Sequence, residues 1–478
     1  MSINYNLDSK QIEYAPKSET ILLFGGLTLT RERILQAAAA SVGEEYIFLP
    51  NATYRSYELG KMYGNKAQCS PTYFTVGNLI KYLIYLRDEK KIPTKEIIRR
   101  YVHVTANGCG PCRFGMYITE YKKALRDAGF DGFRVVSFEH NGNIFQEAQE
   151  QIVKFSPKFF IILTKAAIIA DILTILGDKL RPYELNKGEV DKVLKRCEDK
   201  IVEALKNRRS LIRELYSCRK ELEKLSLNRV VPKPKVMVMG EFWAAMTRSD
   251  GNYQIHKFLE EQGAEVISQP LINRILLNIW EAEYLREQKE GLDSKGLVDF
   301  SEAKKKTLIL GAKYSIRATF NLYAKAIGLK GYELANMDYL YKIAKDYYPV
   351  DSNGGEGHLE VAHLLEAIKH KSAHLVVSVK PFGCMPSSGV SDGIQSLVTS
   401  KFKDANFISL ETSGDGAVNF YSRLQMALFK AKQSAKEEFS KFKLPSSIPS
   451  FVNRYNFEPK APCISTAAKI AFYLEQRR

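Results

Sequence analysis

The stretch that decides the fold is YVHVTANGCGPCRFGMYITEYKKALRDAG, residues 101–129. An apolar run of strand length leads into a loop rich in glycine and proline, and a segment with helical spacing follows. The apolar residues of that segment recur every three or four positions, at Phe114, Ile118, Tyr121, Leu125 and Ala128. The stretch therefore predicts a strand, a loop and a helix, which is the building unit of a parallel sheet covered by helices.

The same alternation of strands and helices extends to both sides of this unit. It runs through residues 19–142 and resumes in 231–440, whereas 143–230 reads as helices only. An irregular lead-in (1–18) precedes the first domain, and we expect the Pro- and Ser-rich tail (441–478) to wrap around another part of the molecule. The sequence predicts an α/β protein with two Rossmann-like domains, each a doubly wound parallel sheet, and a helical insert.

The chain is strongly basic. Its 478 residues include 70 Lys and Arg against 54 Asp and Glu, a formal net charge of +16. Such an excess suits an acidic partner protein, a phosphorylated ligand or nucleic acid. Because the basic residues are spread along the chain and no nucleic-acid-binding pattern accompanies them, we expect a solvated basic surface and no nucleic-acid partner.

Cysteine usage and apolar segments bear on the compartment. The first residues have no basic start followed by an apolar block, so we expect no secretory signal. Seven cysteines, an odd number, then argue against a disulfide scaffold and predict a cytoplasmic protein. The long apolar segment 158–180 contains Lys165 and Asp171, whose charges are costly in a bilayer, so we expect a core helix rather than a membrane span.

Four of the cysteines lie in loops rich in glycine and proline. They are Cys69, Cys109, Cys112 and Cys384. Neighbouring glycines, among them Gly110 and Gly383, allow the backbone to approach a bulky group. At least two of these loops should lie beyond the carboxyl ends of parallel strands, where ligands bind in open sheets. Cys197 and Cys218, in the helical insert, have the spacing of packing residues and are expected to be structural.

The residues alone leave four interpretations of these cysteines. Three or four thiolates that converge on one crevice suit an iron–sulfur cluster, which we favour. A thioredoxin-like dithiol of Cys109 and Cys112 would need later antiparallel strands and a cis-proline loop, which the sequence does not predict. Zinc also suits four cysteines, but only one CxxC pair is present. Unconnected structural cysteines are the fourth interpretation.

Two charged residues beside these loops are further candidates. Glu241 ends the apolar run that starts at Lys235, where it could orient a ligand or exchange a proton, or simply pair with an arginine. Arg113 directly follows Cys112 and could donate to an anionic cluster or hold a carboxylate.

Several phrases together resemble a known family. They are NGCGPCRFGMY (107–117), GEFW with DGNYQIHKFLEEQGAEV (240–266), GGEGH (354–358), KPFGCMPSSGVSDGIQSL (380–397) and ETSGDGAVNFYSRLQMAL (411–428). The chain is similar, over about residues 60 to 435, to the group related to 2-hydroxyacyl-CoA dehydratases and double-cubane-cluster proteins, the acyl-CoA dehydratase activase-related proteins. It has no P-loop or other ATPase signature and so is not itself an activator.

This resemblance implies a site and an activity. Two facing Rossmann-like domains would hold an oxygen-sensitive iron–sulfur cluster, either a 4Fe-4S cubane or a double-cubane 8Fe-9S cluster. Its ligands would be Cys69, Cys109 and Cys384, with Cys112 a fourth ligand or a spectator, and Glu411 would stand in the family's acidic pair on the substrate side. A separate ATP-hydrolysing activator would deliver low-potential electrons for the reduction or dehydration of a small substrate, in a homodimer or a heterodimer with a related subunit.

Two other functions stay open from the sequence. The chain could be a non-catalytic subunit that carries a cluster or serves as a scaffold in a larger complex. It could also be a thiol–disulfide oxidoreductase that uses Cys109 and Cys112 alone.

Overall fold

The chain forms two parallel sheets surrounded by helices. A computed structural model of the 478 residues describes positions 13–44, 46–106, 108, 112–138, 156–290, 300–350, 355–388 and 392–477. Within them lie two four-stranded sheets in which every pairing is parallel. This confirms the α/β class.

The first sheet has the strand order β2-β1-β3-β4. Its strands are β1 (Ile21–Phe24), β2 (Tyr46–Phe48), β3 (Tyr101–Ala106) and β4 (Arg134–Phe138). The connecting helices are α1 (Leu29–Ala40), α2 (Tyr54–Tyr63), α3 (Ser70–Asp88), α4 (Thr94–Arg100) and α5 (Tyr117–Asp127). After β2 the chain crosses to the other side of β1, so the connections diverge between β1 and β3.

Alternating side chains cover both faces of this sheet. Leu22 and Val102 pack with Phe159 on one face, and Leu23 packs on the other face with residues of α3 and α5. Both faces are buried, which is why the strands read as continuous apolar runs. The buried side of α5 is centred on Tyr117 and Ala124 and so is turned slightly from the predicted face.

Helix α2 was not predicted, and it lies against α3 at backbone distance. A Cβ atom at Gly60 would lie 1.9 Å from the Tyr73 carbonyl oxygen, and one at Gly77 would lie 1.8 Å from the Ser56 oxygen. The two glycines therefore let the helices touch without intervening side chains.

The second sheet repeats the order of the first, as β6-β5-β7-β8. Its strands are β5 (Lys235–Gly240), β6 (Glu265–Ile267), β7 (Leu375–Pro381) and β8 (Phe407–Thr412). Its helices are α9 (Phe242–Met246), α10 (Ile255–Glu261), α11 (Leu271–Glu290), α12 (Phe300–Ile327), α13 (Met337–Ala344), α14 (Gly357–His370), α15 (Asp392–Lys401) and α16 (Ala417–Ser440).

Helix α10 begins later than predicted. The spacing predicts a helix over 252–263, but Tyr253 and Gln254 have left-handed φ angles of 55° and 51°. The Asn252 side chain donates to the Ala244 and Thr247 carbonyls at 2.8 and 2.7 Å and so fixes this turn. The helix starts only at Ile255.

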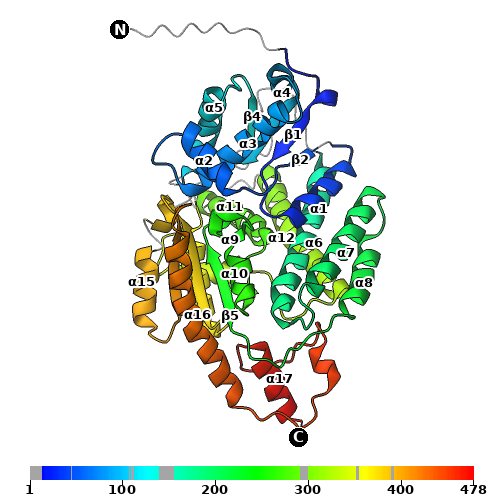
Figure 1. The fold of residues 1–478 in the computed structure, drawn as a ribbon, viewed down its shortest axis with the longest axis vertical. Coiled ribbons are helices and arrows are strands. Elements are labelled where there is room, and N and C mark those ends of the chain that lie inside the picture. Colours follow the sequence, from blue (N-terminus) through cyan, green and yellow to red (C-terminus); the bar gives the residue numbers. More distant parts are fainter. Residues whose placement is uncertain are drawn as a thin grey trace.

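Three further helices lie together beside the sheets (Figure 1). They are α6 (Pro157–Leu180), α7 (Glu189–Lys206) and α8 (Leu211–Leu222). Helix α6 with the turn after it is long and apolar enough to cross a membrane by length and composition, and 61% of its most apolar window is buried within the structure. Cys197 and Cys218 are buried between α7 and α8, each sulfur facing the other's carbonyl at 3.8–3.9 Å.

One of the two charges that interrupt the apolar segment of α6, that of Asp171, is paired with an arginine. The Asp171 carboxylate lies 3.2 Å from Nε of Arg31 on α1 and accepts from the Ile272 amide at 2.8 Å. Both side chains are almost fully buried. Asp171 therefore links the first sheet's helix α1 to the start of α11 beside the second sheet.

The tail turns back onto the second sheet. Helix α17 (Thr466–Glu475) packs against α16 and lies at the end of the molecule opposite to α4 and α5 (Figure 1). The Arg229 guanidinium donates to the carbonyls of Arg454 and Phe457, at 2.7 and 2.5 Å, and holds the tail against the segment before β5.

Candidate site at the carboxyl ends of the two sheets

Cys69 lies where the two halves of the molecule meet. It is the N-cap residue of α3 and is buried. The next residue, Ser70, donates its amide to the Phe382 carbonyl at 3.0 Å and its hydroxyl to the Thr412 carbonyl at 2.8 Å. The Cys69 loop is therefore bound to the loop that follows β7 and to the last residue of β8 in the other sheet.

Cys384 follows β7 in one of these loops. The preceding residue, Gly383, has a φ of +73°, and a Cβ atom there would lie 3.3 Å from Cα of Cys69. The side chain of Cys384 is buried, with its sulfur 3.3 Å from the Ser387 hydroxyl. The structure thus brings two predicted cysteine loops, far apart in the sequence, into contact.

Cys112 is connected to the Cys69 loop by the next residue, Arg113. The Arg113 guanidinium donates to the carbonyl of Ala67, two residues before Cys69. Burial raises the pKa of the Cys112 thiol to about 11, and the charges of Glu241 and Cys69 add to the effect. Arg113 therefore ties one cysteine loop to another, whereas Cys109 and Gly110 lie outside the described residues.

Glu241 stands at the carboxyl end of β5, as predicted, and its partners are backbone amides. It accepts from the amides of Trp243 and Ala244 at 3.1 and 2.9 Å, which caps α9. Burial raises the pKa of this carboxyl to about 7, and nearby Glu356 adds to the shift in spite of the two amide donors. Glu241 can therefore gain or lose a proton near neutral pH.

Two further carboxyl groups, which the sequence analysis missed, surround the site. Glu356 pairs with Arg274 at 2.7 Å, and Glu360 accepts from the Ser387 hydroxyl at 2.6 Å. Burial raises the pKa of Glu356. The two residues are four apart at the start of α14, so their spacing on one helical face was the signal that could have found them.

The GGEGH segment places Glu356 and Glu360 next to the Cys384 loop. Gly355 has a φ of +104°, and a Cβ atom there would lie 2.4 Å from Cγ of Pro386, two residues after Cys384. The segment is thus packed against the Cys384 loop, a position that only glycine allows without displacement.

Glu411 is not brought to this site. It is exposed on β8 and lines a small depression of about 150 Å³ together with Ser413 and Arg423. The Arg423 guanidinium donates to the Ser409 carbonyl at 3.1 Å. Thr412, the next residue along the strand, is the one that is buried towards the cysteine loops.

The donor set suits a metal that binds sulfur, although the described side chains do not complete a ligand set. Within the described ranges, no group of three or more His, Cys, Asp or Glu side chains is close enough to hold a metal ion. The Cys69 sulfur lies 3.1 Å from the Thr72 hydroxyl and 3.2 Å from that of Tyr117. Burial also raises the pKa of Cys384, and Glu241 adds to it, so thiolates here would need a cation beside them.

Comparison with known proteins assigns no family to the chain: no family model matches it, and no curated protein matches it. What the structure defines is an α/β protein with thiols and carboxyl groups gathered at the carboxyl ends of its two sheets. Open parallel sheets bind ligands at this edge.

Proposed function

We propose that this chain is an iron–sulfur protein of the 2-hydroxyacyl-CoA dehydratase-like class. Cys69, Cys112 and Cys384 would hold the cluster, and Cys109 would complete the ligand set. The observation that carries the proposal is the contact between the Cys69 and Cys384 loops, because these loops belong to different sheets. A dithiol at Cys109 and Cys112 alone would not require this contact.

Each half of the molecule would be a Rossmann-like domain. The shared strand order supports this, since β2-β1-β3-β4 and β6-β5-β7-β8 follow the doubly wound pattern. In that pattern the ligand lies beyond the carboxyl ends of the strands, where the connections diverge. Cys112 after β3, Glu241 after β5 and Cys384 after β7 all stand at such ends.

The residues around the thiols would set the properties of the site. When bound, an iron–sulfur cluster of either nuclearity supplies a low-potential one-electron couple. Hydroxyl groups of Thr72, Tyr117 and Ser387 lie within hydrogen-bond distance of cysteine sulfurs, and such contacts adjust reduction potentials. Glu241 would hold and release a proton beside the site.

Electrons would come from a separate ATP-hydrolysing activator, and the reaction would be the reduction or dehydration of a small molecule. The net charge of +16 suits docking to an acidic partner surface. The chain would act in the cytoplasm, as a homodimer or beside a related subunit. A cluster-carrying role without catalysis would use the same site and would differ in that no substrate is converted there.

Metal content tests the proposal. Protein purified without oxygen is expected to contain iron and sulfide in stoichiometric amounts and to absorb visible light, and Cys69→Ala and Cys384→Ala should each lose most of the iron. Cys463→Ala is the matched control, because Cys463 lies half-buried in the tail segment before α17 and should leave the iron unchanged. Cys69→Ser and Cys384→Ser, with circular dichroism, separate ligand loss from misfolding.

Two results would overturn the proposal. Unchanged iron content in both Cys69→Ala and Cys384→Ala would remove the cluster from this site. Disulfide-reductase activity in air that persists in both variants would instead assign the chemistry to Cys109 and Cys112. Turnover of a substrate with the activator and no other subunit would separate an enzyme from a carrier.

A further inference from the structure

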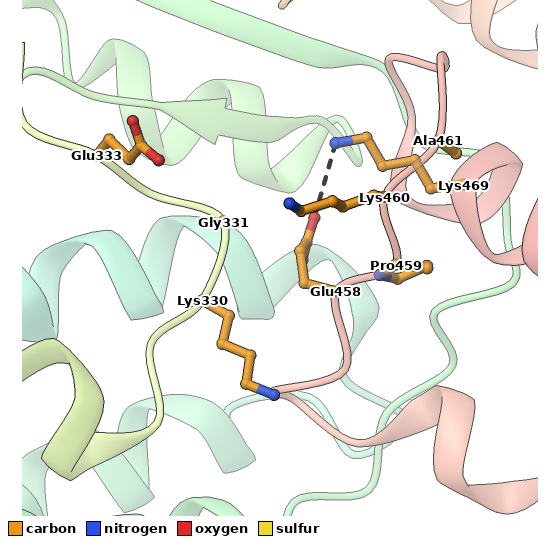
Figure 2. Close-up of a pocket in the computed structure, with 8 residues that line it drawn as sticks. All are labelled: Lys330, Gly331, Glu333, Glu458, Pro459, Lys460, Ala461 and Lys469. Atoms are coloured by element: carbon orange, nitrogen blue, oxygen red, sulfur yellow. Dashed lines mark ion pairs between the residues drawn. The ribbon is translucent and has the colours of Figure 1, made fainter.

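A cationic cavity lies at the other end of the second sheet. It has a volume of about 480 Å³ and opens between the segment after α12 and the tail segment before α17 (Figure 2). Its lining residues are Lys330, Gly331, Glu333, Glu458, Pro459, Lys460, Ala461 and Lys469. A volume of this size falls within the range of small-molecule sites.

Glu458 lines the cavity and lies among several cations. Its carboxylate lies 2.6 Å from the Lys179 ammonium, 3.3 Å from the Arg229 guanidinium and 3.8 Å from the Lys469 ammonium. Burial opposes ionisation of Glu458, but Lys179 and Lys235 outweigh it and hold the pKa of this carboxyl at about 2. Glu458 is therefore a permanent anion already shared among several cations.

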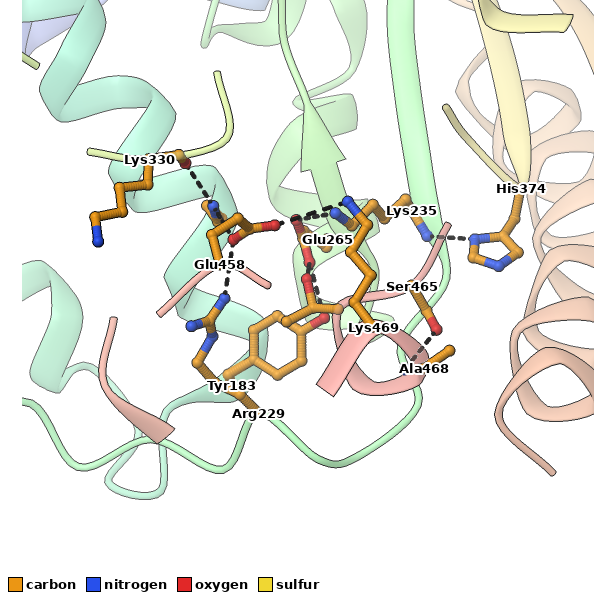
Figure 3. A network of polar contacts seen from close by, with 12 residues as sticks. Tyr183, Arg229, Lys235, Glu265, Lys330, His374, Glu458, Ser465, Ala468 and Lys469 are labelled. Atoms are coloured by element: carbon orange, nitrogen blue, oxygen red, sulfur yellow. Dashed lines mark hydrogen bonds and ion pairs between the residues drawn. The ribbon is translucent and has the colours of Figure 1, made fainter. Parts of the chain in front are cut away.

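A second carboxylate, that of Glu265, also has several partners. Glu265, the first residue of β6, lies 3.2 Å from the Lys235 ammonium and accepts from the hydroxyls of Tyr183 and Thr466, each at 2.8 Å. Figure 3 shows Glu265 and Glu458 side by side, with basic side chains around them. Three partners thus share the acceptor positions of this carboxylate.

The balance of charge in this network is positive. Four buried or half-buried cations, Lys179, Arg229, Lys235 and Lys469, face the two carboxylates Glu265 and Glu458. Arg229 has only 1% of its side chain exposed, and Lys235 only 9%. Burial lowers the pKa of Lys469, and the charge of Lys235 adds to this. An added anion would relieve that repulsion.

The rim of the cavity also carries positive charge. Lys330 and Lys460 are exposed, and in the described part of the chain neither ammonium has a carboxylate partner within 4.0 Å. Glu333 and Glu458 are the two acidic residues of the lining, and Glu333 is exposed like the two lysines. The two lysines come from opposite walls of the cavity, and Glu458 lies between them, as Figure 2 shows.

This cavity is separate from the cysteine site. Lys235 begins β5 and Gly240 ends it, about 16 Å away at the usual rise per residue, and Glu241 directly follows Gly240. Ligand binding here and metal binding there can therefore be measured independently.

We infer that this cavity binds a small, multiply charged anion of the phosphate-ester and pyrophosphate class. Lysine ammonium groups are point charges that suit phosphoryl oxygens, and three lysines line the cavity, Lys330 from the segment after α12 and Lys460 and Lys469 from the tail. Since the tail supplies Glu458, Lys460 and Lys469, the ligand also fastens the tail to the second sheet.

Calorimetric titration of the full-length, metal-free protein with inorganic pyrophosphate tests the inference. Pyrophosphate should bind with a stoichiometry of one at constant ionic strength, and sodium chloride should produce no saturable heat. Lys330→Gln and Lys460→Gln should each weaken the affinity up to about fivefold, as expected for exposed charges. Glu333→Gln should tighten it. Lys122→Gln, at an exposed position on α5 near the opposite end, is the control and should change nothing.

Three outcomes would overturn the inference. They are no saturable binding of pyrophosphate, equal affinity in the wild type and in the Lys330→Gln Lys460→Gln double variant, and weaker binding in Glu333→Gln. Citrate that binds as tightly as pyrophosphate would show that charge alone, and not the phosphoryl group, is recognised. All variants at the rim are exposed, so the fold should survive them, and thermal midpoints without ligand check this.

Discussion

Substitution of Gly383 by alanine probes the contact between the two cysteine loops. Gly383 has a φ of +73°, and the new Cβ atom would lie 3.3 Å from both Cα of Cys69 and the Gln68 carbonyl oxygen. Both atoms belong to the backbone, so they cannot give way by a change of rotamer. Gly43 is a matched control, because its φ of +84° is similar but nothing lies within 4 Å of a Cβ atom there.

The cost of each substitution can be estimated from these geometries. A left-handed conformation costs alanine about 1–2 kcal/mol relative to glycine, and both variants carry this term. Overpacking at Gly383 adds about 1–3 kcal/mol, since the two loops must separate by a few tenths of an ångström. Gly383→Ala should therefore cost about 1–3 kcal/mol more than Gly43→Ala, and this extra cost falls on the contact between the two cysteine loops.

Native-state thiol labelling can measure this difference locally. Labelling of a buried cysteine by a maleimide follows the local opening equilibrium, so about 1.4 kcal/mol corresponds to a tenfold rate. We expect Cys69 and Cys384 of the metal-free Gly383→Ala protein to react about 5 to 100 times faster than in Gly43→Ala. Cys197 and Cys218, buried between α7 and α8, provide an internal control in the same sample.

The outcome separates a local effect from a global one. Equal rates for Cys69 and Cys384 in the two glycine variants would show that the loops are not in contact, and the proposed site would lose its basis. A similar acceleration at Cys197 would show that Gly383→Ala destabilises the whole chain rather than the contact.

Three other perturbations have expected outcomes. The pKa of Glu458 is lowered to about 2, so ionisation of this carboxyl stabilises the fold above pH 4.5, and the stabilisation is lost as the pH falls towards 2. Glu458→Gln should therefore lower the free energy of unfolding by up to about 3 kcal/mol at pH 7. Near pH 2, urea titrations should give the variant and the wild type similar free energies of unfolding. The pKa of Glu241 is raised to about 7, so the free energy of unfolding of the wild type should fall by up to about 3 kcal/mol as the pH rises from 4.5 through 7. Glu241→Gln should not show this fall, and thermal scans at about pH 5 and 8 would measure the difference. Gly77→Ala places a Cβ atom 1.8 Å from the Ser56 carbonyl and should lower the thermal midpoint far more than Gly25→Ala, where nothing is near.

The strands could be predicted from the sequence because both faces of each sheet are buried. Runs such as Tyr101–Ala106 and Leu375–Pro381 are mostly apolar and can be recognised without knowledge of their partners. Helix α2 could not be predicted in this way, since its sequence YRSYELGKMY is mixed in polarity and its position depends on the two glycine contacts with α3. The late start of α10 likewise depends on the hydrogen bonds of Asn252, which no periodicity reports.

The sequence indicated some of the residues that lie at this edge of the sheets and missed others. Cysteines next to strand ends and glycines indicate a shared edge of the sheets. Glu411 and Thr412 are adjacent in β8, yet only one of them can face inwards, because neighbouring side chains of a strand point to opposite sides. Glu356 and Glu360 reach the site only because Gly355 packs against Pro386, a tertiary contact that the sequence does not encode locally.

The opposite ends of the second sheet carry opposite charge, and the topology explains this. In a parallel sheet the helices run against the strands, so helix N-termini gather at the carboxyl ends and helix C-termini at the amino ends. Glu241 caps α9 and Glu356 starts α14, where the helix dipole favours anions, whereas Lys179 stands in the last turn of α6, where it favours cations. The carboxyl end of the second sheet is therefore suited to a cationic ligand beside its thiols, and the amino end is suited to an anionic ligand. Since about 16 Å of β5 separates the two ends, no single small ligand satisfies both, and each proposal stands or fails by itself.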